Sequence, residues 1–153
     1  MINYNIGVIC DSPSVQMGAQ YDELASHFNN IMFHLMFRRP EQGNAAWSPV
    51  RPSKCSSEIL PTLSLPLPSR FRNCINNNIS PVLNSYDFDA VIVHGFYDST
   101  AVLQAQRWAR RNHKPVFIRT DANMDSQQQR PIKLAIRKTL FGRLARRSSG
   151  VLS

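Results

Sequence analysis

The sequence predicts an α/β fold, a Rossmann-like open parallel sheet with helices on both faces. Two short apolar runs, residues 89–98 and 115–123, each pass from Val, Ile and Phe into polar residues. A continuous apolar run is typical of a strand buried on both faces, as in a parallel sheet. The helical segment 99–112 lies between the runs, so the three segments together predict a βαβ unit.

The first part of the chain predicts two more strands joined by a helix. Residues 4–10 and residues 31–37 are apolar runs of strand length. Between them, apolar residues recur at spacings of four, three and four over residues 14–28. This spacing places them on one side of a helix, with acidic residues on the other side.

The middle of the chain is harder to interpret. Residues 38–73 contain six prolines, and we expect an ordered excursion with a short strand near 59–65. Trp47 is the expected packing anchor of this excursion. Residues 71–85 have an apolar side of helical spacing, which predicts a weak helix interrupted by Pro81.

The last part of the chain completes the sheet. Strands are expected at residues 88–93 and 115–118, on either side of the helix in the βαβ unit. A further helix is expected over 131–147, because Pro131 suits a first turn and apolar residues then repeat every four positions. Residues 150–153 resemble the start of one more strand.

Size and charge limit the classes of protein to consider. The length of 153 residues predicts a single domain, residues 1–153. The net charge is +8, but residues 1–106 carry −2 and residues 107–153 carry +10. Such asymmetry favours an anionic partner for the last third, namely nucleic acid, an anionic membrane or a phosphorylated substrate. A solvated basic face is the ordinary alternative.

Cysteine usage and apolar runs bear on location and on metals. Three cysteines, Cys10, Cys55 and Cys74, lack CxxC spacing, which argues against a disulfide framework and a structural zinc. No apolar run reaches the roughly 18–20 residues that a membrane span requires. The expected location is the cytoplasm, with a peripheral position at the inner membrane surface left open. No metal is expected.

Polar residues follow the predicted strands where each strand ends. His94 ends one run, Arg119, Asp121 and Asn123 end the next, and Asp11 follows the first strand. The carboxyl ends of parallel strands meet at one edge, where ligands of open α/β sheets bind. We therefore expect these side chains to share a site.

The same strand ends carry two motifs, His-Gly-Phe-Tyr over 94–97 and Arg-Thr-Asp-Ala-Asn over 119–123, which begin 25 residues apart. With the basic helix that follows, they resemble the N-terminal domain of GT-B fold glycosyltransferases, in particular glycosyltransferase family 4. The resemblance is clearest over 86–153. It implies one half of a GT-B fold, an acceptor-side domain truncated before the donor-binding C-terminal domain.

The resemblance also implies an activity. This activity is transfer of a sugar from a nucleotide-sugar donor to a glycan, lipid-linked or small-molecule acceptor. It would need no metal and no cofactor besides the nucleotide-sugar co-substrate. The implied catalytic residues are His94 and Asp121, and the implied substrate-binding residues are Asp11, Gly95, Tyr97, Arg119 and Asn123. The enzyme would be hexosyltransferase-like, and the 153-residue chain alone is expected to be inactive.

Each site residue also has a structural interpretation. His94 is either a functional group near pH 7 or a histidine satisfied by backbone groups. Arg119 either binds a phosphate or acidic group or forms an ion pair with Asp121 or Asp98. Asp121 and Asn123 also suit a turn. Asp11 either contacts the acceptor or caps the helix that follows it.

Two other classes of protein stay open. One is a non-catalytic basic α/β domain that binds nucleic acid or another anionic ligand, although the basic region has no known nucleic-acid module signature. The other is a flavodoxin-like or regulatory ligand-binding domain, which needs no second half. The helix 131–147 likewise either makes weak contact with an anionic membrane or packs its apolar stripe on the sheet.

Overall fold

The computed structural model describes residues 3–40, 52–63, 75–94, 99–120, 139 and 142–152. Six strands form the main sheet: β1 (Tyr4–Cys10), β2 (Ile31–Phe37), β3 (Ser56–Ile59), β6 (Ala90–His94), β7 (Val116–Arg119) and β8 (Gly150–Leu152). The helices are α1 (Val15–His27), α2 (Ser80–Ser85) and α3 (Thr100–Arg111). A small antiparallel pair joins β4 (Thr62–Leu63) to β5 (Ile75–Asn76).

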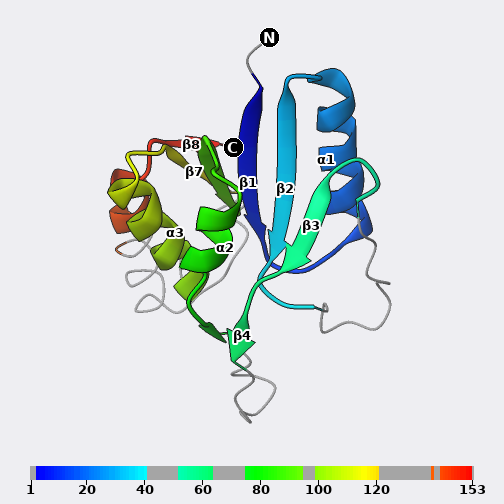
Figure 1. Cartoon of the computed structure of the whole chain (residues 1–153). Coiled ribbons are helices and arrows are strands. Elements are labelled where there is room, and N and C mark those ends of the chain that lie inside the picture. Colours follow the sequence, from blue (N-terminus) through cyan, green and yellow to red (C-terminus); the bar gives the residue numbers. More distant parts are fainter. Residues whose placement is uncertain are drawn as a thin grey trace, which may run out of the picture.

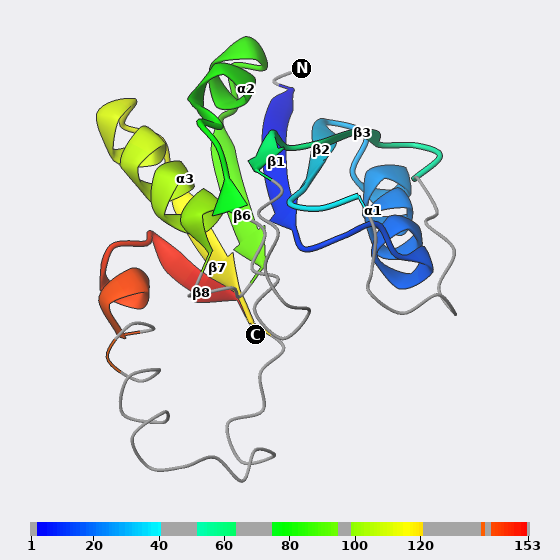
Figure 2. The same cartoon turned by 90° about the horizontal axis from the view of Figure 1, so that it is seen from below.

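The strand order of the main sheet is β3-β2-β1-β6-β7-β8, and each pairing between these strands is parallel. Helix α1 lies on one face of the sheet, and α2 and α3 lie on the other (Figures 1 and 2). The predicted class, an open parallel Rossmann-like sheet with helices on both faces, is confirmed. The order reverses between β1 and β6, so these two strands form the switch point at which such sheets bind ligands.

Successive residues of each strand point to opposite faces, and this alternation divides the core in two. We call the face under α2 and α3 the α3 face. Its core residues come from the central strands and from the helices above them, and from the sheet they include Ile9, Val91, Val93, Val116 and Ile118, none more than 3% exposed. This face therefore holds a closed layer of apolar side chains.

Gly7 belongs to the closely packed α3 face. A Cβ at this position would lie 2.9 Å from Met36 Cε and 3.0 Å from Phe88 Cδ2. Both distances are shorter than ordinary van der Waals contact, so these two side chains occupy the volume that a larger residue would need. Glycine within β1 lets the Phe88 ring pack directly on the strand.

We call the opposite face the α1 face. Its core cluster includes Val8, Cys10, Phe33 and Leu35 from β1 and β2, together with Tyr21 from α1. The α1 helix begins at Ser14, whose hydroxyl accepts a hydrogen bond from the Met17 backbone N–H at 3.2 Å. Figure 2 shows α1 beside β1, β2 and β3, and no other described helix lies on this face.

Several local predictions were wrong. Of the helix expected over 71–85, the structure describes residues 75–85, and among these only Ser80 to Ser85 are helical, with β5 before them. Pro81 lies in the first turn of α2, where its missing N–H breaks no helix hydrogen bond, so it begins the helix instead of interrupting it. The single strand expected near 59–65 is instead the end of β3 followed by β4.

Other predictions fall partly or wholly on residues that the structure does not describe. Trp47 lies outside the described residues, and so do residues 131–138 of the expected basic helix. Residues 142–146 of that helix are helical, and Leu144 is buried in the core of the α3 face. This part of the helix supports the interpretation in which the apolar stripe packs on the sheet.

Candidate functional site

The strand ends predicted to carry the site lie at one edge of the sheet. In the register of β6 and β7, His94 is the partner of Arg119, and Asp11 directly follows β1 on the other side of β6. The structure therefore places these three predicted residues on neighbouring strand ends. Gly95, Tyr97, Asp121 and Asn123 lie outside the described residues, and their roles stay predictions.

Asp11 forms ion pairs with two arginines at the end of β2. Its Oδ1 accepts a hydrogen bond from Arg39 Nε at 2.9 Å, and the second Arg39 nitrogen contacts Oδ2. Arg38 Nη2 lies 3.4 Å from Oδ1, and the Arg38 side chain is only 7% exposed. The suggestion that Asp11 caps α1 is wrong, because Ser14 fills that position. Arg38 and Arg39 were not predicted as site residues, although they follow β2 as Asp11 follows β1.

His94 is buried on the α1 face and contacts a residue of α1. Its Nε2 lies 3.0 Å from Tyr21 Oη, a hydrogen bond between residues that are each at least 95% buried. The two rings also meet edge to face, with centroids 6.0 Å apart. His94 thus has a side-chain partner, whereas the structural alternative considered for it named backbone groups. Its catalytic role stays a prediction.

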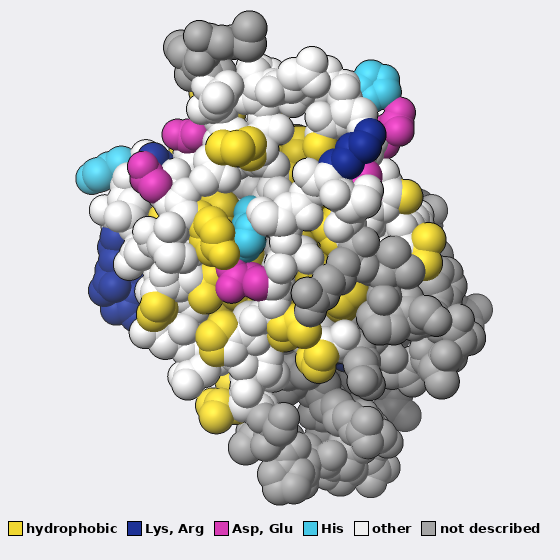
Figure 3. All heavy atoms as spheres, turned by 45° about the vertical axis from the view of Figure 1, so that its right-hand side comes forward, with side chains coloured by type: hydrophobic (Ala, Val, Ile, Leu, Met, Phe, Trp, Pro, Cys, Tyr) yellow, Lys and Arg dark blue, Asp and Glu magenta, His cyan; other side chains and the backbone are white. Residues whose placement is uncertain are grey.

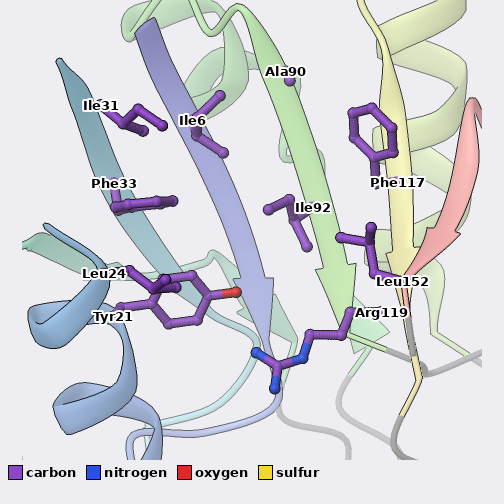
Figure 4. A pocket seen from close by; sticks show the side chains of 10 residues that line it. All are labelled: Ile6, Tyr21, Leu24, Ile31, Phe33, Ala90, Ile92, Phe117, Arg119 and Leu152. Carbon is purple, nitrogen blue, oxygen red and sulfur yellow. The ribbon is translucent and has the colours of Figure 1, made fainter. Parts of the chain in front are cut away.

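A pocket of about 470 Å³ lies on the α1 face, beside α1 and over β1, β6 and β7 (Figure 4). Residues that are partners in the parallel register lie side by side along the pocket. Ile6 is paired with Ala90, Ile92 with Phe117, and Arg119 with Leu152, and all six side chains line the pocket. The wall is completed by Tyr21 and Leu24 from α1 and by Ile31 and Phe33 from β2.

The polar groups of this pocket lie at one end. Figure 4 shows the Tyr21 hydroxyl and the Arg119 guanidinium near the carboxyl ends of the strands, while Ile6, Ile31 and Ala90 lie toward the other end. The other eight lining residues have apolar side chains. Arg119 was predicted as a site residue, whereas Tyr21 was expected only as one of the regularly spaced apolar residues of the helix over 14–28.

Neither described cysteine is a candidate nucleophile. Burial raises the pKa of the Cys10 thiol far above its ordinary value, while the positive charge of Arg119 acts in the opposite direction and Asp11 adds to the rise. Burial, with the nearby Asp22 carboxylate, raises the pKa of Cys55 to about 11. Both groups are therefore protonated thiols at neutral pH, and thiols are poor nucleophiles.

The described residues contain neither a metal-binding group of side chains nor a membrane-spanning helix. Within the described ranges, no three His, Cys, Asp or Glu side chains are grouped so that they could hold a metal ion. Among the helices that the structure describes, none combines the length and apolar character of a membrane span.

The described cations do not form a continuous basic surface on the face seen in Figure 3. The Lys and Arg side chains there lie in separate groups, with apolar, acidic and neutral side chains between them. Several exposed cations of the basic third, among them Arg110, Arg111 and Arg143, lie on α3 or on the last described helical segment. The described Lys and Arg side chains thus do not define an interface on this face.

Together these observations define an α/β domain with a pocket beside the switch point of its sheet. No family model matches the sequence, and no curated protein matches it. Among solved structures, the chain is similar to an isochorismatase-like hydrolase from Alkaliphilus metalliredigens, with 9% identity and a TM-score of 0.42. The match covers 99% of this chain and 94% of that one.

This result corrects the glycosyltransferase interpretation. The similar structure is a hydrolase and not one half of a GT-B enzyme, and no family model or curated relative restores the resemblance. The hexosyltransferase-like activity is wrong with it, as are the nucleotide-sugar donor, the sugar acceptor and the missing donor domain as partners. The nucleic-acid alternative also has no support. A likeness this weak does not give the chain the activity of a hydrolase.

Proposed function

We propose that this domain binds a small, mostly apolar molecule in the pocket on the α1 face. The observation that carries the proposal is the pocket itself, an apolar wall over three parallel strands with its polar groups at one end. Its volume of about 470 Å³ lies within the roughly 300–1,000 Å³ typical of small-molecule sites. Such sites combine apolar walls with a few converging polar groups.

The position of the pocket adds a second line of support. Open parallel sheets bind ligands near the carboxyl ends of the strands, where the strand order reverses. The polar end of this pocket is formed at the ends of β6 and β7, next to the β1–β6 switch point. Exposed parts of Ile92 and Phe117 would lose contact with water when the pocket is filled, which is a driving force for binding.

A pair of tryptophan variants tests this function. Ile92→Trp places a large ring in the pocket, whereas Met32→Trp places the same ring on a side chain that is 58% exposed. A neutral aromatic probe, 2-naphthol, is titrated into each ¹⁵N-labelled protein, and amide shifts are followed by NMR. We expect binding with shifts at Ile92 and Phe117 in the original protein and in Met32→Trp, and no binding in Ile92→Trp. Equal titration curves for the two variants would remove the pocket as the site.

A further inference from the structure

Three polar side chains form a chain of hydrogen bonds across β2 and β3. Ser56 is the register partner of His34, and Glu58 lies two residues further along β3, so the three side chains point to the same face of the sheet. His34 Nδ1 lies 2.5 Å from Ser56 Oγ, and His34 Nε2 lies 2.8 Å from Glu58 Oε1. Phe33 and Leu35, on either side of His34, belong to the core of the α1 face. The cluster therefore lies on the face of the sheet opposite the pocket.

The hydrogen-bond pattern makes His34 a base toward Ser56. An ionised carboxylate only accepts hydrogen bonds, so in the neutral ring Glu58 places the hydrogen of His34 on Nε2. Nδ1 then presents a lone pair, which accepts the hydrogen of the Ser56 hydroxyl. A hydroxyl that is bonded to a base, with the base oriented by a third group, is the arrangement of an activated serine nucleophile.

The imidazole of this cluster is held in place by an aromatic neighbour. His34 is 3% exposed, and its ring stacks on the Tyr86 ring with centroids 3.9 Å apart. Burial raises the pKa of the Tyr86 phenol, and the charge of Glu58 and a hydrogen bond to it raise that pKa further. Tyr86 therefore stays a neutral donor to Glu58. Ser56, in contrast, is exposed, so the reactive end of the chain faces solvent while the imidazole is packed.

The edge of β3 also offers backbone donors. The Leu60 N–H donates to Phe37 O at 2.8 Å, and N–H groups alternate in direction along a strand, so those of Ser57 and Ile59 point away from β2. Strand β3 is the edge strand of the described sheet, with no described strand on that side (Figure 1). The N–H of the residue that follows a nucleophile commonly stabilises the oxyanion formed in acyl transfer. The Ser57 N–H has this position.

We propose that Ser56, His34 and Glu58 form a nucleophilic site for the acyl group of small carboxylic esters. Ser56 Oγ bonds to the ester carbonyl carbon, and the bond from that carbon to the alcohol oxygen breaks. The Ser56 proton passes to His34 Nδ1 and then to the departing alcohol oxygen. Water then bonds to the acyl carbon, one of its protons passes through Nδ1 to the Ser56 oxygen, and a carboxylic acid leaves. Ser56 and His34 are catalytic residues and Glu58 is a positioning residue. This activity does not depend on the binding function of the pocket.

The ester 4-nitrophenyl acetate tests the nucleophile. Nitrophenolate release is followed by absorbance, and the acetylated position is found by peptide mapping with mass spectrometry. We expect an acetyl group on Ser56 that hydroxylamine removes, since hydroxylamine cleaves an ester and not the amide formed at an exposed lysine such as Lys54. Ser56→Ala should abolish this label and slow the release about 10-fold or more, the effect of losing a base-activated nucleophile. The matched control is Ser85→Ala, at an exposed serine whose hydroxyl donates to the Val82 carbonyl.

The positioning role of Glu58 has its own measurement. Ring ¹⁵N shifts of His34 report which nitrogen carries the hydrogen, and we expect Nε2 in the original protein. Glu58→Gln should move the hydrogen toward Nδ1, because the glutamine amide can donate to Nε2, and should slow acetylation of Ser56 about 10-fold. Ser56→Cys keeps a nucleophile beside the imidazole and should be acetylated at the same position. An unchanged tautomer and unchanged labelling in Glu58→Gln would contradict the positioning role.

The alternative is a cluster that only attaches β3 to β2. In that case Ser56→Ala and Glu58→Gln lower the urea midpoint, while Ser56 in the original protein is acetylated no faster than Ser85, and this result would overturn the proposal. Ser56 is exposed, so Ser56→Ala and Ser56→Cys are expected to fold, and circular dichroism checks this. These two variants decide the nucleophile even if Glu58→Gln unfolds.

Discussion

The two faces of the sheet are built from the same strands but are covered to different extents. On the α3 face, Val93 of β6 and Ile118 of β7 are buried beneath α2 and α3. On the α1 face, the neighbouring residues Ile92 and Phe117 are only partly buried and line the pocket. The side chains are of similar kinds on the two faces, so the difference comes from the helices above them.

An apolar face of a sheet can therefore stabilise the fold or line a pocket, depending on whether helices cover it. Where helices cover it, each methyl group contributes to the stability of the fold. Where coverage ends, as it does beside α1, the same kind of side chain lines a space that can receive a ligand. The polar end of the pocket, at Tyr21 and Arg119, marks where specificity would arise.

The largest predicted effect is on stability and separates the two faces directly. Ile118→Ala leaves a cavity in the closed layer of the α3 face and should cost about 2–5 kcal/mol of unfolding free energy. Ile92→Ala enlarges a space that is already open and should cost about 1 kcal/mol. Urea unfolding of both variants measures the difference. Equal losses would show that the α1 face is as closely packed as the α3 face.

A smaller effect is predicted for two glycines on opposite faces. Gly7→Ala brings a methyl group within 2.9 Å of Met36 Cε and 3.0 Å of Phe88 Cδ2, and such overpacking should cost about 1–3 kcal/mol. Gly150→Ala brings one to 3.3 Å from Phe117 Cδ1, where the ring can move toward the pocket. We expect this second change to lie within about 0.5 kcal/mol of zero. Thermal or urea unfolding measures the stability lost in each variant. A larger loss for Gly150→Ala than for Gly7→Ala would contradict the comparison between the two faces.

The sheet itself was largely predictable from the sequence. The apolar runs at 4–10, 31–37 and 88–93 were each expected as strands, and each contains a parallel strand of the sheet. Local signals also placed the starts of α1 and α3 to within about one residue of the N-caps Ser14 and Ser99. The β4–β5 pair was not predictable, because two-residue strands have no periodicity and are held by a contact between distant segments.

The pocket was not predictable from the sequence for a related reason. A continuous apolar run indicates burial on both faces, and nothing in Val91-Ile-Val93 marks Ile92 as the less buried residue. The exposure of Ile92 depends on where α1 lies above the sheet. The contact between Tyr21 and His94 joins residues 73 positions apart and depends on the same helix placement. Arg119 and His94 were found because residues at strand ends can be located from the strands alone.

The smallest predicted effect concerns the link between α1 and the segment before β3. Asp22 accepts hydrogen bonds from the backbone N–H groups of Ser53 at 2.7 Å and Lys54 at 2.8 Å, and from the Ser53 hydroxyl. Burial alone would raise the pKa of this carboxyl, but these bonds outweigh it and the pKa lies below its ordinary value of 3.8. The charged form of Asp22 is therefore favoured in the folded state.

A carboxyl whose pKa is lower in the folded state stabilises the fold above its unfolded pKa and loses that contribution as pH falls through the folded pKa. Asp22→Asn should therefore lower the urea midpoint modestly at pH 7, and the difference from the original protein should shrink below about pH 4. Asp87→Asn is the control, since the Asp87 side chain is 95% exposed and its ion pair with Lys114, at 3.6 Å, is of the surface kind that contributes little to stability. A pH-independent difference for Asp22→Asn would mean that packing, and not the charge, attaches α1 to the segment before β3.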